Sequence, residues 1–358
     1  MKQGKVKNPK RLLHFDVLRL ISMSFVVILH VLQRYYEIDF TSTIAFSFLY
    51  SVSLGLFFFS SAYFIKKCES FKDLLAYLLK LIFAYIFPAY LFTVLSIFLL
   101  PRFADFNFGY WMRELYLRTD TFYWFFLTLF FINAFIAIAY FIASQIIRKK
   151  NLKAHITIVL IIALLLSAYA QIFVYIYNAP DLGPGTLASN LFLYYAPIAF
   201  LGFAIGVFNK YYQKWKHLNL FRTILFIFST FSYIISLIYF PNWLEGLNGS
   251  FTDIFYRLLG SIAGIISYYL LANYLVRFNI VRKASYFAKY SGPLYLVHVF
   301  FIRLINEYMQ RPSVFDGTTI LFLTIWTLVF YLGSLGVSIL LVEFKPTNLL
   351  LFGIFKKQ

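Results

Sequence analysis

Residues 15–31 read FDVLRLISMSFVVILHV, an apolar stretch long enough to form most of a membrane-spanning helix. The stretch nevertheless carries Arg19 and His30, and ionisable residues inside a bilayer are costly unless they face protein or a watery path. They lie eleven positions apart, about three helical turns, so the two side chains share one face about 16 Å apart along the axis. The stretch therefore predicts a membrane helix with a fixed cation near one surface and a proton-transfer group toward the other.

The whole chain has the composition of a polytopic membrane protein. Of its 358 residues, 61% are hydrophobic and only 13% are charged, and uncharged runs of about twenty residues recur along it. These runs lack the period-two alternation of a transmembrane β-barrel, so we predict an all-α fold. The net charge of +18 is interpreted as basic cytoplasmic loops rather than as a nucleic-acid surface. The single cysteine, Cys68, excludes an internal disulfide framework and a cysteine-rich metal site.

We predict about ten membrane helices, the first of which is a retained span, because no small-residue cleavage site follows it. The ten segments are 15–34, 43–65, 74–100, 121–147, 154–177, 190–208, 221–240, 254–276, 290–309 and 318–342. Lysine and arginine gather in the N-terminal tail and in every second connection, whereas the other connections are acidic or neutral. This alternation predicts that both termini are cytoplasmic. The predicted division is a basic cytoplasmic tail at 1–14, a membrane domain at 15–342 and a cytoplasmic tail at 343–358.

In this topology Arg19 lies near the cytoplasmic surface and His30 near the outer one. Arg19 is either an anchor whose charge reaches the interface or a forked cation that captures a phosphate or carboxylate. Asp16, three residues earlier on the same face, can pair with Arg19 and reduce the cost of burying both charges. His30 is either a structural histidine or a general base, because neutral imidazole can accept a hydroxyl proton near neutral pH. The shared face favours the functional interpretation of Arg19 and His30.

A second histidine, His298, lies midway along the ninth predicted span, with Tyr295 three residues before it. A structural role and a functional role are about equally open for His298. Arg303 and Glu307 follow on one helical face, four residues apart. They form either a structural ion pair or part of a site for an acceptor substrate.

Two further residues have both a structural and a functional interpretation. Lys80, early in the third predicted span, either reaches the cytoplasmic surface or attracts an anionic ligand there. Trp124 belongs to an aromatic group that forms an interfacial belt or, less favoured, a stacking surface for a sugar ring. The chain has no G-x-S-x-G elbow, no glycine-rich lysine loop and no His-Glu-x-x-His motif. Serine hydrolysis, nucleotide hydrolysis and metal chemistry of the common kinds are therefore not expected.

The order of several motifs resembles the acyltransferase-3 family of integral membrane acyltransferases. Asp16, Arg19 and His30 reproduce the family's opening pattern of an aspartate, an arginine, ten residues and a histidine. Four later segments also resemble the family, and the last of them would put Tyr295 and His298 on family positions. These segments, in the expected order, are LFFFSSAYFI (56–65), FYWFFLTL (122–129), YYAPIAFLGFAIG (194–206) and SYFAKYSGPLYLVHVFF (285–301).

The chain departs from the family pattern at two places. Ala62 stands where the family usually has glycine, and Lys80 and Pro88 occur without the arginine pair that often precedes this proline. If those arginines hold the donor, Lys80 is an imperfect substitute, because a lysine lacks the guanidinium fork. The chain resembles the stand-alone members, which have no appended extracytoplasmic esterase-like domain.

The resemblance implies transfer of an acyl group, usually acetyl from cytoplasmic acetyl-CoA, to a hydroxyl of a cell-surface or lipid-linked polysaccharide. It also implies residence in a bacterial plasma membrane. The phosphates of the donor need cations, which Arg19, oriented by Asp16, and Lys80 would supply. No metal and no nucleic acid are expected as partners.

Within that reaction His30 would be the general base that takes the acceptor hydroxyl proton. His298 or Tyr295 would orient the base or polarise the thioester carbonyl. A covalent acetyl-histidine relay is a less economical route. The expected acceptor contacts are Arg303, Glu307 and Trp124.

The main rival from another class is a carrier or flippase for a lipid-linked oligosaccharide. Ten helices with buried cations suit a carrier, but transport gives no reason for Arg19 and His30 to share a face. A purely structural subunit is a more distant reading, because buried charges without a role are costly. Among enzymes, succinyl or longer donors and amino acceptors also fit. The sequence is silent on the acceptor glycan and on the oligomeric state.

Overall fold

The computed structural model describes residues 12–35, 43–65, 67–99, 124–146, 157–162, 165, 190–212, 219–241, 243, 251–308 and 317–346. Every regular element within these residues is a helix, which confirms the predicted all-α class. The elements, in order, are α1 (Leu13–Tyr35), α2 (Ile44–Tyr63), α3 (Phe71–Leu81), η2 (Ile82–Ile86), α4 (Phe87–Leu99), α6 (Trp124–Ile146), α8 (Asn190–Tyr212), α9 (Asn219–Tyr239), α11 (Phe251–Leu275), α12 (Asn279–Ala284), η5 (Ser285–Tyr290), α13 (Ser291–Tyr308) and α14 (Gly317–Glu343).

By length and composition, seven helical segments in the described part of the chain can cross a membrane. They match the first four, the seventh, the eighth and the tenth predicted spans. In the sixth predicted span, α8 holds a shorter apolar segment, Tyr194–Val207, and α13 occupies the ninth. Most of the fifth predicted span, 154–177, lies outside the described residues. The protein is a polytopic helical membrane protein, while the count of ten and the cytoplasmic location of both termini stay predictions.

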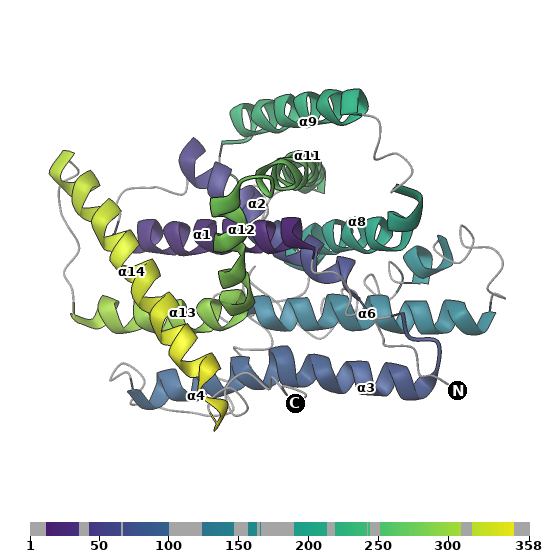
Figure 1. Ribbon diagram of the computed structural model, residues 1–358, viewed down its shortest axis with the longest axis horizontal. Coiled ribbons are helices and arrows are strands. Elements are labelled where there is room, and N and C mark those ends of the chain that lie inside the picture. The colour runs from purple at the N-terminus through teal and green to yellow at the C-terminus, as the bar shows by residue number, and fades with distance from the viewer. Residues whose placement is uncertain are drawn as a thin grey trace.

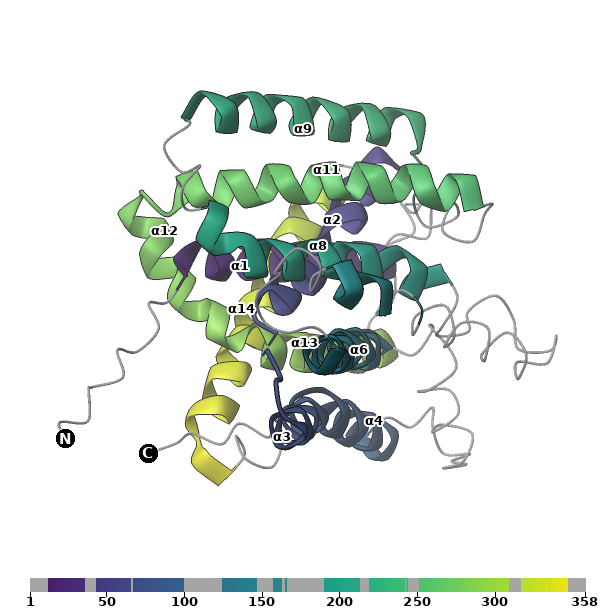
Figure 2. The ribbon, with the colours of Figure 1, turned by 90° about the vertical axis from the view of Figure 1, so that its right-hand side faces the viewer.

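α1 lies in the middle of the helix assembly, as the two views in Figures 1 and 2 show. It packs against α2, α11, α13 and α14, which come from both halves of the chain. Its side chains Phe15, Leu18 and Val27 are fully buried. The first helix therefore forms the scaffold on which late helices are assembled, and this arrangement brings distant segments of the sequence to its surface.

The third predicted span is interrupted by a π turn, η2, between α3 and α4. The turn ends two residues before Pro88, which has no backbone N–H and whose ring would clash with the carbonyl of Ala84 in a regular α-helix. Local widening of this kind is how a membrane helix accommodates proline. The sequence predicted one continuous helix here, and the π turn is the difference.

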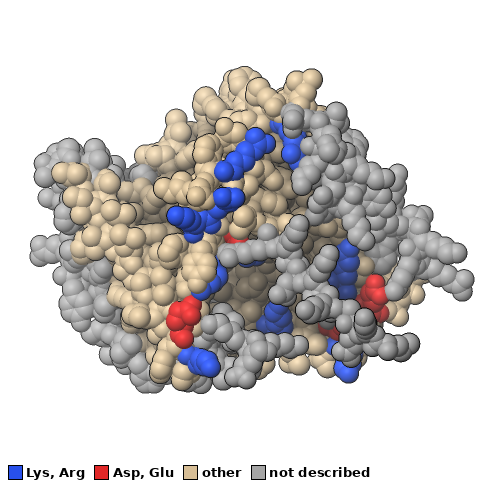
Figure 3. All heavy atoms as spheres, in the orientation of Figure 1, with Lys and Arg blue, Asp and Glu red and all other residues tan. Residues whose placement is uncertain are grey.

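α9 lies at the edge of the assembly, where its neighbour is α11 (Figure 2). Its outward face is strongly apolar, with Ile224, Ile227 and Phe231 more than half exposed. Lysine, arginine, aspartate and glutamate cover only a small part of the described surface in Figure 3. An apolar exterior of this kind is what contact with lipid requires.

α8 and α2 approach closely through glycine. A Cβ atom at Gly202 would overlap the backbone carbonyl of Phe59, and one at Gly206 would lie 2.6 Å from the carbonyl oxygen of Tyr63. The two glycines are four residues apart, so they present one smooth face of α8 to the backbone of α2. Small residues at this spacing allow membrane helices to pack at backbone contact.

A polar latch joins η5, which directly precedes α13, to the end of α14. Nζ of Lys289 lies 2.9 Å from Oε1 of Glu343, and the hydroxyl of Tyr290 donates to the same oxygen at 2.7 Å. The ammonium of Lys289 also lies 2.7 Å from the hydroxyl of Tyr286. Burial opposes the charge of Lys289, but its hydrogen bonds to Tyr286, Tyr290 and Glu343 raise its pKa above the usual lysine value. The latch holds the segment from which α13 starts.

Candidate active site

Two histidines from distant parts of the chain meet between α1 and α13. The ring centroids of His30 and His298 are 5.6 Å apart, and the ring planes are tilted by 36°. The two helices pack directly against each other, so the pair belongs to a protein-filled interface. The sequence identified each residue separately, and the fold brings them together.

The buried surroundings of His298 define its protonation pattern. The ring is fully buried, and Nδ1 lies 3.0 Å from the backbone carbonyl oxygen of Leu294. Because a carbonyl oxygen can only accept, Nδ1 carries the proton and Nε2 keeps its lone pair in the neutral ring. Nε2 has no hydrogen-bond partner among the described residues. His298 therefore holds an unprotonated nitrogen in the interior, on a ring that neighbours His30.

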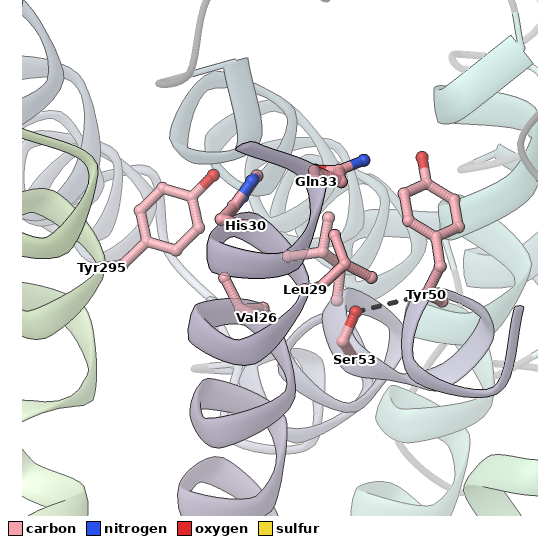
Figure 4. Close-up of a pocket in the computed structure, with 8 residues that line it drawn as sticks. Val26, Leu29, His30, Gln33, Tyr50, Ser53 and Tyr295 are labelled. Carbon is pink, nitrogen blue, oxygen red and sulfur yellow. Dashed lines mark hydrogen bonds between the residues drawn. The ribbon is translucent and has the colours of Figure 1, made fainter. Parts of the chain in front are cut away.

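Tyr295 lies one helical turn before His298 on α13. Its ring centroid is 5.3 Å from that of His298, in an edge-on arrangement. The rings of Phe125 and Phe126, on α6, also contact the ring of Tyr295, with centroid distances of 4.9 and 5.3 Å. In Figure 4 the hydroxyl of Tyr295 points toward His30. Tyr295, His298 and His30 thus form one cluster at the junction of three helices.

A small cavity of about 160 Å³ opens beside His30. Its apolar lining consists of Val26, Leu29 and Leu54, and its polar lining includes Tyr295. Figure 4 shows the residues that line the cavity. Since one water occupies about 30 Å³ of liquid, the cavity has room for a small acyl or hydroxymethyl group.

Three polar residues of this cavity were not identified from the sequence: Gln33, Tyr50 and Ser53. Gln33 follows His30 by three residues, so the helical period that pairs Arg19 with His30 also puts Gln33 on that side. Tyr50 and Ser53 are three residues apart on α2, and the hydroxyl of Ser53 donates to the carbonyl of Tyr50 at 3.4 Å. Nothing in the sequence alone distinguishes them from the many other serines and tyrosines of the chain.

Arg19 lies on the same unbroken helix as His30 but has different neighbours. Its guanidinium carbon lies over the ring of Phe64, 5.3 Å from the centroid, at the end of α2. Asp16 is buried in the first turn of α1, where a carboxylate is favoured by the helix dipole. The helix thus keeps Arg19 about 16 Å from His30 along its axis.

The other predicted site residues are less closely defined. Lys80 is exposed in the last turn of α3, immediately before the π turn. Trp124 starts α6, and Arg303 and Glu307 lie in the second half of α13, but the side chains of these three lie outside the described part of the chain. Their parts in donor or acceptor binding stay predictions. No group of three or more His, Cys, Asp or Glu side chains within the described ranges is arranged to hold a metal ion.

Comparison with known proteins identifies the family. A family model described as an acyltransferase domain, of the acyltransferase-3 family, matches residues 12–343. No curated protein matches the chain, and no solved structure does. The match extends from α1 to the end of α14 and includes both histidines and Arg19. The chain therefore belongs to the acyltransferase-3 family and is a multi-pass membrane acyltransferase.

Proposed function

We propose that this protein moves an acetyl group from cytoplasmic acetyl-CoA to a hydroxyl of a cell-surface or lipid-linked polysaccharide in a bacterial plasma membrane. The single observation that carries the proposal is the His30–His298 pair beside a small, mostly apolar cavity. Acyl transfer to a hydroxyl needs a base next to a pocket for the acyl carbon. In a chain of this family, the pair supplies the base and the cavity supplies the pocket.

The reaction assigns a separate task to each group. The acceptor hydroxyl loses its proton to His30 as its oxygen attacks the thioester carbonyl carbon of the donor. The tetrahedral intermediate collapses with cleavage of the C–S bond, and the thiolate of CoA takes the proton back from the imidazolium. The products are an O-acetyl sugar and CoA. Tyr295, whose hydroxyl points toward His30, is suited to donate a hydrogen bond to the developing oxyanion.

His298 acts in this scheme through His30 rather than on the substrate. Its ring orientation is maintained by the hydrogen bond to Leu294. Its Nε2, which has no hydrogen-bond partner among the described residues, belongs to a ring whose centroid lies 5.6 Å from that of His30. An acceptor there can hold an N–H of His30 and keep the other nitrogen of His30 available as the base. His298 is therefore a positioning residue.

The donor and acceptor bind on opposite sides of this cluster in our scheme. Arg19, with Asp16 three residues before it, and Lys80 attract the phosphates of acetyl-CoA from the cytoplasmic side. Trp124, Arg303 and Glu307 contact the sugar from the outer side. The 16 Å between Arg19 and His30 is then the path of the donor's flexible arm.

The test is NMR of surface polysaccharide from cells that carry the protein or an empty vector, with O-acetyl groups counted per repeat unit. We expect acetyl signals only with the protein. A change in the amount of exported polymer without any acetyl difference would contradict the proposal and favour a carrier for a lipid-linked oligosaccharide. Release of free CoA from purified protein gives an independent measure of acetyl transfer.

Substitution His298→Phe tests the positioning role. The ring shape is retained but Nε2 is lost, so we expect kcat to fall about 10- to 100-fold, because small errors in the placement of a catalytic group are expensive. The KM for acetyl-CoA should change by less than about threefold, since His298 does not bind the donor in this scheme. His298→Gln, which keeps a side-chain acceptor, should restore part of kcat. A rise in KM at constant kcat would instead assign His298 to donor binding.

A further inference from the structure

A second polar cluster lies inside the molecule, away from the histidines. Nδ2 of Asn133, on α6, donates to the hydroxyl oxygen of Ser61, on α2, at 3.0 Å. The same hydroxyl lies 3.4 Å from the hydroxyl of Tyr85, in the π turn η2. Three separate helical segments thus contribute one polar side chain each to a single point in an apolar interior.

The orientation of the Asn133 amide follows from its second hydrogen bond. Nδ2 also donates to the carbonyl oxygen of Leu129 at 2.8 Å, and a carbonyl can only accept. If the amide were flipped, Oδ1 would face the carbonyl oxygen of Leu129, and neither oxygen could donate. Oδ1 is therefore the atom that points away from Leu129. Asn133 is 1% exposed, and Oδ1 has no hydrogen-bond partner in the described part of the chain. A buried acceptor without a donor is unfavourable, and it suggests that a ligand supplies the donor.

The cluster is not wholly buried. Asn133 is buried, but Ser61 and Tyr85 are both only partly buried. Tyr85 lies in the π turn, and π turns within helices occur frequently at functional sites. A ligand that reaches Ser61 and Tyr85 therefore comes next to the amide oxygen of Asn133.

A chain of ring contacts connects this cluster to the histidine pair. The ring of Tyr85 lies 5.9 Å from that of Phe126, and Phe126 lies 5.3 Å from Tyr295, which contacts His298. Along α6, Asn133 is eight residues from Phe125, or about 12 Å toward the other end of the helix.

The cluster also lies close to the level of Arg19. Along α2, Ser61 is three residues before Phe64, whose ring Arg19 covers. The cluster therefore lies between the level of the predicted phosphate site at Arg19 and the level of the catalytic pair at His30.

We propose that Asn133, Ser61 and Tyr85 bind a secondary amide of the acyl donor. This inference rests on the proposed function, because the arm of CoA between phosphates and sulfur contains two secondary amides. The amide N–H donates to Oδ1 of Asn133, and a hydroxyl of Ser61 or Tyr85 donates to the amide carbonyl. Binding of this amide fixes how far the arm extends into the protein and so holds the thioester at the depth of His30.

The experiment measures binding of two probes to the full-length protein in lipid nanodiscs by titration calorimetry. The probes are CoA, which has the amide arm, and adenosine 3′,5′-bisphosphate, which has phosphates but no arm. We expect Asn133→Leu to weaken CoA binding about tenfold and to leave the bisphosphate affinity unchanged, since one hydrogen bond to the arm is lost. Tyr85→Phe, a milder change on a partly exposed ring, should weaken CoA alone by about threefold.

The matched control is Ser144→Ala on the same helix, where the hydroxyl donates to the carbonyl of Phe141 at 2.6 Å and accepts from Nε2 of Gln145 at 3.2 Å. It should bind both probes as the unsubstituted protein does. If CoA binds equally well to the protein with and without Asn133→Leu and Tyr85→Phe, the amide site is wrong. Equal weakening of both probes would also overturn it, because the cluster would then only hold helices together. If the unsubstituted protein binds neither probe, the proposed donor itself is wrong.

Discussion

Replacement of His30 by alanine is expected to lower the rate of acetyl transfer by about 10²- to 10⁴-fold, the usual contribution of a general base. Among the described residues that line the cavity, His30 is the one imidazole. The adjacent ring of His298 acts in the proposed scheme only as a positioning group. The loss should appear in kcat at saturating acetyl-CoA, because the proposed site for the donor phosphates, at Arg19, lies about 16 Å away. Steady-state release of CoA by purified protein measures it.

His14→Gln is the matched control for this experiment. His14 lies at the other end of α1, where its ring contacts Phe15 and Tyr269 at centroid distances of 4.6 and 5.5 Å. It should retain nearly all activity. Full acetyl transfer by the His30→Ala protein would remove His30 from the mechanism, and His298 would become the next candidate for the base.

Substitution Gly202→Ala is expected to cost about 3 kcal/mol of stability, the upper end of the usual range for overpacking. The added methyl group would overlap the backbone carbonyl of Phe59, which cannot rotate away as a side chain could. α8 must then separate from α2, and both helices belong to the buried core. We expect a lower midpoint of thermal unfolding in detergent and a smaller yield of monodisperse protein.

Gly336→Ala provides the comparison, because a Cβ there meets no atom within 4 Å. Alanine is a better helix former than glycine by about 1 kcal/mol, so this variant should be as stable as the parent or slightly more so. Equal stability of the Gly202→Ala and Gly336→Ala proteins would show that the close contact of α8 with α2 is not needed.

Much of the fold follows from hydrophobic runs of membrane length, and the helix class, the first four spans and the late spans were predictable from them. The π turn was not, because Pro88 is compatible with a kink, a break or a widened turn, and only packing selects among these. The shared face of Arg19 and His30 was predictable from helical period alone, since both belong to one helix.

The meeting of His30 with His298 was not predictable from local pattern, because it depends on which helix packs against α1. Sequence spacing carries no information on contacts between helices far apart in the chain. The same limit applies to Asn133, which looks like an isolated polar residue in an apolar helix until α2 and the π turn are brought to it.

The packing of α1 against α13 also has a consequence for the synthesis and assembly of the protein. His30 is synthesised early and His298 only when most of the chain has been made, so a partly made chain has the first histidine without the second. Such a chain, and any fragment that lacks the late helices, contains Arg19 and His30 but no histidine pair. Formation of the histidine pair therefore depends on a late step of assembly, because α13 must pack against α1 before the two rings can meet.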